Sequence, residues 1–425
     1  MASVENVRKT IFSIWENKEI RNKLWFSILV IIVFRIMAAV PVPGVPLGAL
    51  QQFFGSSGFG EVMSLVSGGV LQNATMVAIG LGPYINSSII FQLMGSVIPK
   101  IEELQKEGAH GRKLLNMYTR LLTVPLAIVQ SFVIYSLLKQ YGIMEELVLL
   151  DLVNMIATLT AGAIIMMWLG ELVSEMGIGG GSSLLIFAGI LSGIPGSVKV
   201  NFGLMSSQTL MILAGLVVGV VLLVVFVNQA ERRIPIQYAR RVRSIGAAAE
   251  SHIPLKLNQS GVMPVIFAMS LLSFPQLIAQ FLTGDAVHEN IKWVSEWVIN
   301  QLDNVYVYNG LLVVAIIVFS LFYLFVVFNP DNIAENLQKQ AAFIPGVRPG
   351  KQTSKYLSAS ALRLGILGAV FLAAIAVLPV LAKETGLITS AIISGTGMLI
   401  VVNTVLDMRR QVESMIVTRS YEHYM

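Results

Sequence analysis

The chain has 425 residues and a formal net charge of +5; 55% of its residues are hydrophobic and only 12% are charged. An average soluble domain carries about twice that charged fraction, so the composition excludes a set of water-soluble domains. The chain has no cysteine, which excludes disulfides, thiolate catalysis and metal sites built on cysteine. These values together predict an integral membrane protein.

The N-terminal segment, residues 1–23, is polar and lacks the apolar core of a cleavable signal peptide. Between Val4 and Trp15 the apolar residues share one helical face, opposite Arg8, Lys9 and Lys18. A helix with this pattern is typical of a segment lying on a membrane surface. We therefore predict a cytoplasmic amphipathic N-terminus.

From residue 24 onward, apolar runs long enough to cross about 30 Å of hydrocarbon recur along the chain. The runs are continuous rather than alternating, so we expect helices and not the strands of a barrel. Ten spans are predicted, the fifth of them short and flanked by glycine and proline. They cover residues 24–40, 74–98, 121–138, 152–170, 182–194, 207–227, 262–282, 310–328, 362–382 and 387–406.

The basic residues predict the orientation of these spans. Of the 29 Lys and Arg residues, 24 fall in segments on the side of the N-terminus and four in segments on the opposite side. Because cytoplasmic connections are enriched in Lys and Arg, both termini, including the tail 407–425, are predicted to be cytoplasmic. The spans divide into two halves, residues 24–200 and 201–406, whose opposite orientation is compatible with an inverted repeat.

The segment 55–73 lies between the first two spans and is rich in glycine, serine and apolar residues, with Glu61 as its one charge. It is too short to span a bilayer. Irregular backbone at membrane depth is tolerated only when protein buries it or when it lines a watery cavity. We predict a re-entrant half-helix; the alternative is an outer loop packed on the helices.

Ionisable residues are nearly absent from the spans. Arg35 is the exception; it could extend to the outer interface or pair within the bundle. Ion-coupled carriers keep carboxylates near the bilayer midplane, and the spans offer none there. The uncharged polar residues within the spans, such as Gln92 and Asn154, are explained by packing or hydrogen bonding between helices.

Two long cytoplasmic loops, residues 228–261 and 329–361, carry clustered cations. The first contains Arg240, Arg241 and Arg243; in the second, two proline–glycine pairs surround Arg348 just before Lys351. Such turns predict a stiff projecting tip. One interpretation is that these cations only satisfy the positive-inside bias, and the other is a docking surface for an acidic or RNA-rich partner.

Seven short motifs, in order along nearly the whole chain, resemble those of the SecY family, the large subunits of bacterial protein-conducting channels. Two positions depart from the usual pattern: Gly180 replaces asparagine, and Leu81 stands where isoleucine is frequent. The resemblance implies an all-α membrane fold of ten helices in two inverted five-helix halves, with a re-entrant plug. The motifs are Pro41–Gly44, Gly82–Ile85, Gly108–Arg112, Gly177–Gly179, Arg232–Tyr238, Pro254–Asn258 and Phe343–Gly350.

The resemblance also implies a pore ring of six aliphatic side chains. A collar of this kind gates by dewetting, because it offers water and ions no hydrogen bonds. Without the resemblance, these positions read as ordinary core or lipid-facing residues. The segment 55–73 would be the plug, represented by Phe59, Met63, Leu65 and Val66. The ring would consist of Leu81, Ile85, Ile186, Ile190, Ile266 and Ile400.

A lateral gate is implied between the second and third spans on one side and the seventh and eighth on the other. Ser87, Gln130 and Asn258 could form a polar latch there, although Asn258 could instead cap the seventh helix. Hydrophobic signal sequences would enter this seam and shift the gate toward its open form.

The activity implied by the resemblance is that of a pore-forming subunit in the bacterial cytoplasmic (inner) membrane. It would pass secretory polypeptides across the membrane and release hydrophobic segments laterally into lipid. The implied partners are small subunits of the SecE and SecG type, a motor ATPase of the SecA type, the ribosome and signal peptides. Arg348, Lys351 and the cluster of Arg240, Arg241 and Arg243 would serve docking.

Two other function classes remain open from the residues alone. A secondary carrier of small solutes would need polar groups meeting at the midplane, where this chain has aliphatic residues. For an intramembrane enzyme we would expect a catalytic cysteine, a metal-ligand cluster or a pair of intramembrane carboxylates, and the sequence suggests none of these. We therefore expect no catalytic activity and no cofactor.

Overall fold

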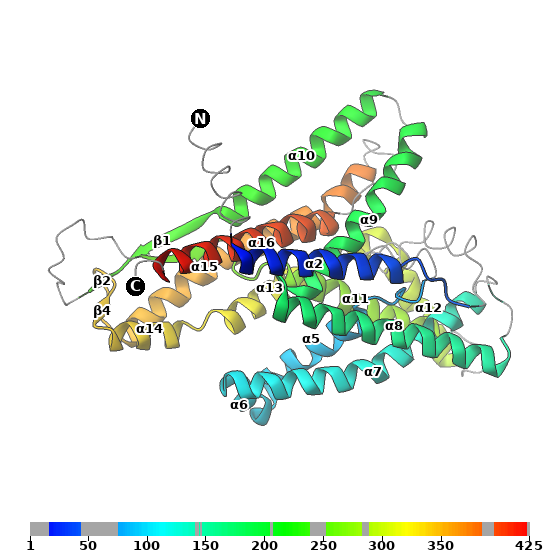
Figure 1. The fold of residues 1–425 in the computed structure, drawn as a ribbon, viewed down its shortest axis with the longest axis horizontal. Coiled ribbons are helices and arrows are strands. Elements are labelled where there is room, and N and C mark those ends of the chain that lie inside the picture. Colours follow the sequence, from blue (N-terminus) through cyan, green and yellow to red (C-terminus); the bar gives the residue numbers. More distant parts are fainter. Residues whose placement is uncertain are drawn as a thin grey trace. The chain divides into compact units, whose positions relative to one another are not determined.

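The structure is a computed structural model that describes residues 17–43, 75–140, 144, 147–204, 207–238, 252–282, 289–384 and 395–422 (Figure 1). Residues 1–16 of the predicted N-terminal surface segment, the predicted plug 55–73, and Arg240, Arg241 and Arg243 lie outside these residues, while residues 18–23 of that segment already belong to the first helix. The chain forms two compact units. The first comprises Met1–Leu204, Met269–Tyr308 and Thr404–Met425, and the second comprises Met205–Ala268 and Asn309–Asn403.

Helices dominate both units, as the apolar runs predict, and each of the ten predicted spans overlaps a helix within the described residues. The helices are α2 (Lys18–Met37), α5 (Gly82–Val97), α6 (Pro99–Lys106), α7 (Ala109–Gln140), α8 (Leu149–Met176), α9 (Gly181–Leu204), α10 (Ser207–Gln229), α11 (Met263–Leu282), α12 (Glu289–Asp303), α13 (Val305–Val327), α14 (Pro330–Lys339), α15 (Lys351–Glu384) and α16 (Gly395–Glu422).

Length and composition support membrane crossing for several of these helices. Within the described residues, four stretches are long and apolar enough: Ala109–Ser136, Leu149–Met176, Val305–Lys339 and Lys351–Leu378. Three shorter apolar helices are Gly181–Ile194, Leu213–Gln229 and Met263–Gln276. The count of ten crossings stays a prediction, as does the division into halves at residue 200.

The second predicted span, 74–98, is wrong over its first residues. Residues 76–81 form turns, and α5 begins only at Gly82. Gly80 has φ +59°, a left-handed conformation that interrupts a helix and suits glycine. Pro83 then stands in the first helical turn, where its missing N–H costs no hydrogen bond. The helix start is therefore set by local backbone chemistry rather than by hydrophobicity.

The core of the first unit lies between α7 and α8, with α5 packed against α7. Small and aliphatic side chains fill it, among them Ala127, Leu159 and Ala163, all nearly without solvent contact. Ser131 and Thr160 bring their hydroxyl groups to 3.3 Å of each other across this contact. Small residues let helix backbones approach closely in a membrane, which is how these two helices hold together.

A glycine-rich turn joins α8 to α9 with unusually close backbone contact. Gly179 has φ +88°, and the backbone N–H of Gly181 donates to Ser174 Oγ at 3.0 Å. A Cβ atom added to Gly181 would lie 1.7 Å from the carbonyl oxygen of Gly170 on α8. Any side chain at Gly181 must therefore push the two helices apart.

We expect Gly181→Ala to lower the free energy of unfolding by about 3 kcal/mol, the upper end of ordinary overpacking costs. Gly193→Ala is the matched control, since a Cβ there would meet nothing within 4 Å and alanine favours helix by about 1 kcal/mol. Thermal unfolding in detergent, followed by circular dichroism, measures both. Equal melting temperatures for the two variants would contradict the close contact.

Candidate functional site

Leu81 and Ile85 stand at the start of α5, one helical turn apart. The Ile85 N–H donates to the Leu81 carbonyl at 2.9 Å, which fixes the two residues on one helix face. Both side chains are buried. The turn before them is held by the Met76 N–H, which donates to the Val40 carbonyl at 2.9 Å. This end of α2 and the start of α5 are thus tied by backbone hydrogen bonds.

Ile186 and Ile190 lie on α9, again four residues apart. Ile186 is buried and Ile190 half-buried. The glycine turn before α9 fixes the start of the helix that carries this pair, because Ile178 donates its N–H to Ser27 Oγ on α2 at 3.0 Å. Gly179 likewise donates its N–H to Gln411 Oε1 on α16. Helices α2, α8, α9 and the C-terminal part of α16 therefore share one anchored corner of the first unit.

The remaining two residues of the predicted ring, Ile266 and Ile400, belong to the second unit. Ile266 lies in the first turn of α11 and Ile400 in the second turn of α16, and both side chains are buried. Phe267, beside Ile266, contacts the rings of Phe319 and Tyr323 on α13 edge to face, at centroid distances of 6.2 and 6.1 Å. These aromatic contacts fix the rotation of α11 against α13.

Of the three predicted gate residues, Ser87 and Gln130 lie in the first unit, and both are buried. Ser87 Oγ on α5 donates to the Thr119 carbonyl on α7 at 2.7 Å. Thr123 Oγ1 donates to the same carbonyl at 2.7 Å. The Ser87 hydroxyl thus fastens α5 to α7.

The third gate residue, Asn258, is buried in the second unit. Its Nδ2 donates to Asn228 Oδ1 at 3.0 Å, and Ser260 Oγ donates to its Oδ1 at 3.3 Å. The alternative that Asn258 caps the seventh span is wrong, because α11 starts at Met263 and its first N–H groups donate to the Val262 carbonyl. Asn258 instead ties the approach to α11 to the end of α10.

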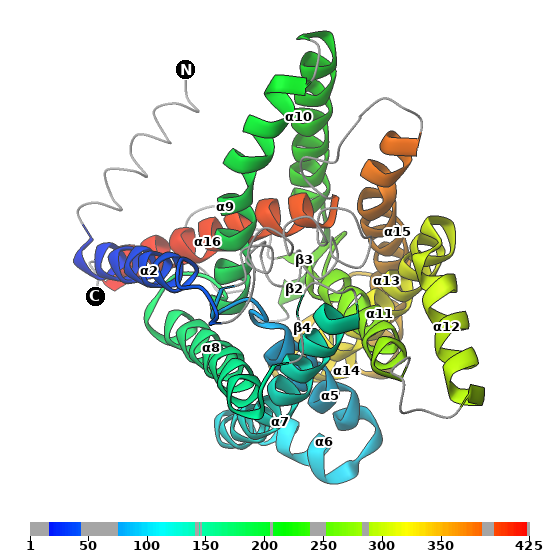
Figure 2. The same cartoon turned by 90° about the vertical axis from the view of Figure 1, so that its right-hand side faces the viewer.

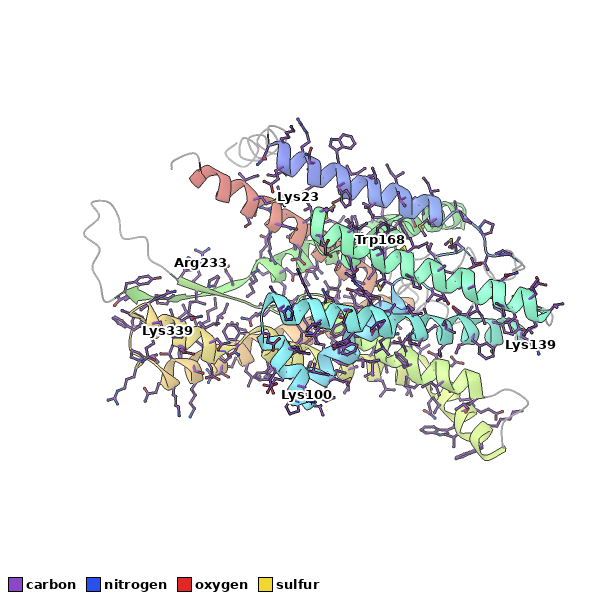
Figure 3. The ribbon with its side chains drawn as sticks, turned by 60° about the horizontal axis from the view of Figure 1, so that its bottom comes forward. Lys23, Lys100, Lys139, Trp168, Arg233 and Lys339 are labelled. Atoms are coloured by element: carbon purple, nitrogen blue, oxygen red, sulfur yellow. The ribbon has the colours of Figure 1, made fainter. Side chains whose placement is uncertain are left out.

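The described parts of the two long loops, residues 228–238, 252–261 and 329–361, fold into one body in the second unit, a feature that the sequence analysis missed. Strand β1 (Glu231–Pro235) pairs antiparallel with β3 (His252–Lys256), and β2 (Gln237–Tyr238) pairs with β4 (Ala342–Phe343). Figure 3 shows Arg233 on β1 and Lys339 at the end of α14, with their side chains projecting from the ribbon. A sequence signal existed: Ile253 and Leu255 alternate with polar residues or proline, as in a strand.

A small apolar cluster holds the two loops together. It contains Ile234, Leu255, Ile344 and Leu357, all buried. Helix α15 also approaches the residue that follows β3 so closely that a Cβ on Gly368 would lie 2.4 Å from the Leu257 carbonyl oxygen. The loops are therefore a packed extension of the helices and not free linkers.

Arg348 is exposed in the turns between β4 and α15, a segment that we call the cationic tip. Its neighbours Gly346 and Gly350 have φ +81° and +94°, which confirms the turns predicted from the proline–glycine pairs. The Thr353 hydroxyl donates to the Arg348 carbonyl at 2.9 Å, and Val347 donates its N–H to the Ile344 carbonyl at 3.0 Å. The backbone around Arg348 is thereby fixed while its guanidinium is free to meet a partner. Lys351, also exposed, begins α15 three residues later.

An ion pair between α7 and α8 was also missed. Arg120 Nε lies 2.8 Å from Glu171 Oε1; the arginine side chain is 49% exposed and the glutamate side chain 13%. The sequence places Glu171 at the rim of a span but gives no partner for it. The pair neutralises a carboxylate that is nearly buried.

We expect Arg120→Ala to lower the free energy of unfolding by about 1 kcal/mol, because it leaves Glu171 unpaired while solvent still screens part of the site. Arg112→Ala, an exposed position on the same helix, is expected to change stability by less than about 0.5 kcal/mol. Thermal unfolding in detergent compares the two. A loss no greater than that of Arg112→Ala would show that the ion pair contributes nothing.

The described residues contain no group of three or more His, Asp or Glu side chains that could hold a metal ion. What the arrangement offers instead is a set of buried aliphatic side chains at helix starts and a rigid cationic tip. The aliphatic side chains suit a barrier to water, and the cationic tip suits the docking of a partner.

The comparisons with known proteins decide the family. The SecY family model matches residues 75–409. The chain is 37% identical to the protein translocase subunit SecY of Mycobacterium bovis, with 96% of this chain and 97% of that one covered. The chain belongs to the SecY family. The corresponding subunit of Corynebacterium glutamicum is 38% identical, with 97% and 98% covered, so the resemblance drawn from the seven motifs is confirmed.

Solved structures show the same fold. A protein-conducting channel matches with a TM-score of 0.65 at 22% identity, covering 93% of this chain and 92% of that one. Sec61 in the canine ribosome–channel complex from the endoplasmic reticulum matches with a TM-score of 0.64 at 20% identity and the same coverage. The chain therefore has the all-α SecY fold and is a multi-pass membrane protein.

Proposed function

We propose that this chain is the central pore-forming subunit of a protein translocation channel, passing secretory polypeptides across a membrane and releasing hydrophobic segments laterally into lipid. The observation that carries this proposal is the similarity over nearly the full length to protein translocase subunits. The seven matching motifs include both the turn at Arg348 and the start of α5, so the similarity extends over loops as well as spans.

The pore ring is the part of the proposal that explains how such a channel stays sealed. Its six members are all aliphatic; five are buried and Ile190 is half-buried. A collar without hydrogen-bonding groups excludes water and ions by dewetting, while its flexible walls adapt to any passing side chain. We propose that Leu81, Ile85, Ile186, Ile190, Ile266 and Ile400 form this collar.

The gate and plug complete the proposed cycle. The seam would run past Ser87, Gln130 and Asn258. The bond from Ser87 to α7 would keep the second and third spans together as the seam opens, and the bond from Asn258 to Asn228 would hold the approach to the seventh span against the end of the sixth. A signal sequence can shift the gate only by its difference in affinity for the open and closed forms. The plug would be the segment 55–73.

The cationic tip is proposed to receive cytoplasmic partners. Arg348 and Lys351 are exposed next to a fixed backbone, and arginine in a fork geometry suits carboxylate and phosphate groups. The partners would be the ribosome and a SecA-type motor ATPase, with Arg240, Arg241 and Arg243 adding to the surface. SecE- and SecG-type subunits would complete the complex.

The proposed location is the bacterial cytoplasmic membrane, with both termini on the cytoplasmic side, because 24 of 29 Lys and Arg residues fall on the side of the N-terminus. The subunit itself would have no enzymatic activity, so the energy for transport would come from a partner.

Crosslinking tests the proposal directly. A photoreactive residue placed at position 81, 186, 266 or 400 is expected to crosslink to a secretory chain stalled during translocation in membrane vesicles. The exposed Trp25 of α2 is the matched control position, where lipid rather than substrate is expected. Crosslinks at position 25 but not at the four ring positions would overturn the collar.

A further inference from the structure

Helix α12 is a short helix that follows the apolar helix α11 in the chain and precedes the apolar helix α13, and the function proposed above makes no use of it (Figure 2). It has 15 residues, about 22 Å of helix at 1.5 Å per residue, which is too short to cross the hydrocarbon. It carries Glu289, Lys292, Glu296 and Asp303, which lipid tails would not accommodate. The helix therefore does not span the membrane.

The two faces of α12 differ in kind. Ser295 and Leu302 are buried on one face. On the opposite face, Trp293 is 69% exposed and Trp297 55%, and Val294, at the edge of that face, is 50% exposed. The two tryptophans are four residues apart, so their indole rings lie side by side along the helix. Two large rings displayed together would be costly in water, whereas tryptophan is enriched where a membrane meets water.

The start of α13 fixes the depth of α12. Asn304 stands between the helices, and its Oδ1 accepts a hydrogen bond from the Tyr306 N–H at 3.0 Å. Helix α13 begins at Val305 and its predicted span begins at residue 310, so α12 ends close to where a membrane crossing is expected to begin. Tyr306, in the first turn of α13, is 71% exposed and is suited to the same interfacial level. Trp297 lies six residues before Asp303, the last residue of α12, so it is about 9 Å along the helix from that end.

We propose that α12 lies in the headgroup region of the bilayer, with Trp293, Val294 and Trp297 inserted among lipid headgroups and upper acyl chains. The occupant of this exposed face is phospholipid, because the face is continuous with the membrane surface at the start of α13. Lys292 and Glu296 flank the indoles, where they can reach lipid phosphate and water. The helix would anchor the connection between α11 and α13 at a fixed depth.

The absence of cysteine allows a clean test in the full chain. A single cysteine replaces Val294 and carries a nitroxide label, and the protein is reconstituted in vesicles of phosphatidylcholine and phosphatidylglycerol. Collision rates with oxygen and with a water-soluble nickel chelate give the depth of the label. Arg233→Cys, on an exposed strand, is the reference for water, and Val318→Cys, exposed on the apolar α13, is the reference for hydrocarbon.

The expected depth for the Val294 label lies between the two references. In the background Trp293→Ser and Trp297→Ser, the label is expected to shift to the water value, while a Trp293→Phe background keeps its depth. A water value in the unaltered background, a value as deep as Val318, or screening from both reagents by covering protein would each overturn the proposal. These readouts do not depend on transport, so they are independent of the proposed channel function.

Discussion

Arg348→Glu is expected to reduce motor-driven export to background while the protein still assembles in the membrane. The side chain is exposed, so its replacement removes no core packing, and the turn around it is held by backbone and Thr353 contacts. Arginine residues at the centre of an interface often contribute about 2 kcal/mol or more, which corresponds to roughly 30-fold weaker binding. Reversing the charge adds repulsion against an acidic partner. ATP-driven translocation into inverted vesicles measures the effect.

Lys339→Glu is the matched control for that experiment. It makes the same charge change on an exposed residue of the same unit, 2.7 Å from Glu335 at the end of α14. We expect export within about twofold of the unaltered protein, because loss of an exposed pair costs less than about 1 kcal/mol. Export through Arg348→Glu equal to that through Lys339→Glu would remove Arg348 from the docking surface and leave the positive-inside explanation.

The positions of the apolar helices could be predicted because a membrane span has one dominant physical requirement, about 20 apolar residues. Where other forces determine where a helix begins or ends, hydrophobicity does not predict its boundaries. The start of α5 is set by Gly80 and Pro83, and α7, α15 and α16 continue as helices well past their apolar stretches. The short helices α6, α12 and α14 each have an apolar side and a charged side. They therefore contain no continuous apolar run, and a search for such runs does not find them.

The candidate site was predictable to a different degree in each part. The turns around Arg348 follow from proline and glycine chemistry, which acts over a few residues. The pairing of β2 with β4 joins residues about 100 positions apart, and neither strand exceeds two residues, so no local signal reports it. The ring residues are aliphatic side chains in apolar helices. Without the family resemblance, nothing distinguishes Ile186 or Ile266 from other core residues.

Ile266→Asn is expected to raise the ion conductance of the resting channel. The side chain is buried in the first turn of α11, and the amide offers hydrogen bonds to water where the aliphatic group offers none. An apolar constriction holds back ions by excluding water, so one polar group in it lowers the barrier to wetting. A tenfold rise in leak corresponds to about 1.4 kcal/mol of that barrier. Conductance across planar bilayers containing the purified channel measures it.

Two further variants separate the collar from a general loosening of α11. Leu271→Asn places the same amide on the same helix at a side chain that is 46% exposed, and it is expected to leave the leak unchanged. Ile266→Leu keeps an aliphatic side chain of equal volume and is expected to keep the seal, because volume-conserving swaps cost little. A leak that rises equally in Ile266→Asn and Leu271→Asn would mean that any polar group on α11 disturbs the channel, and Ile266 would then have no place in a collar.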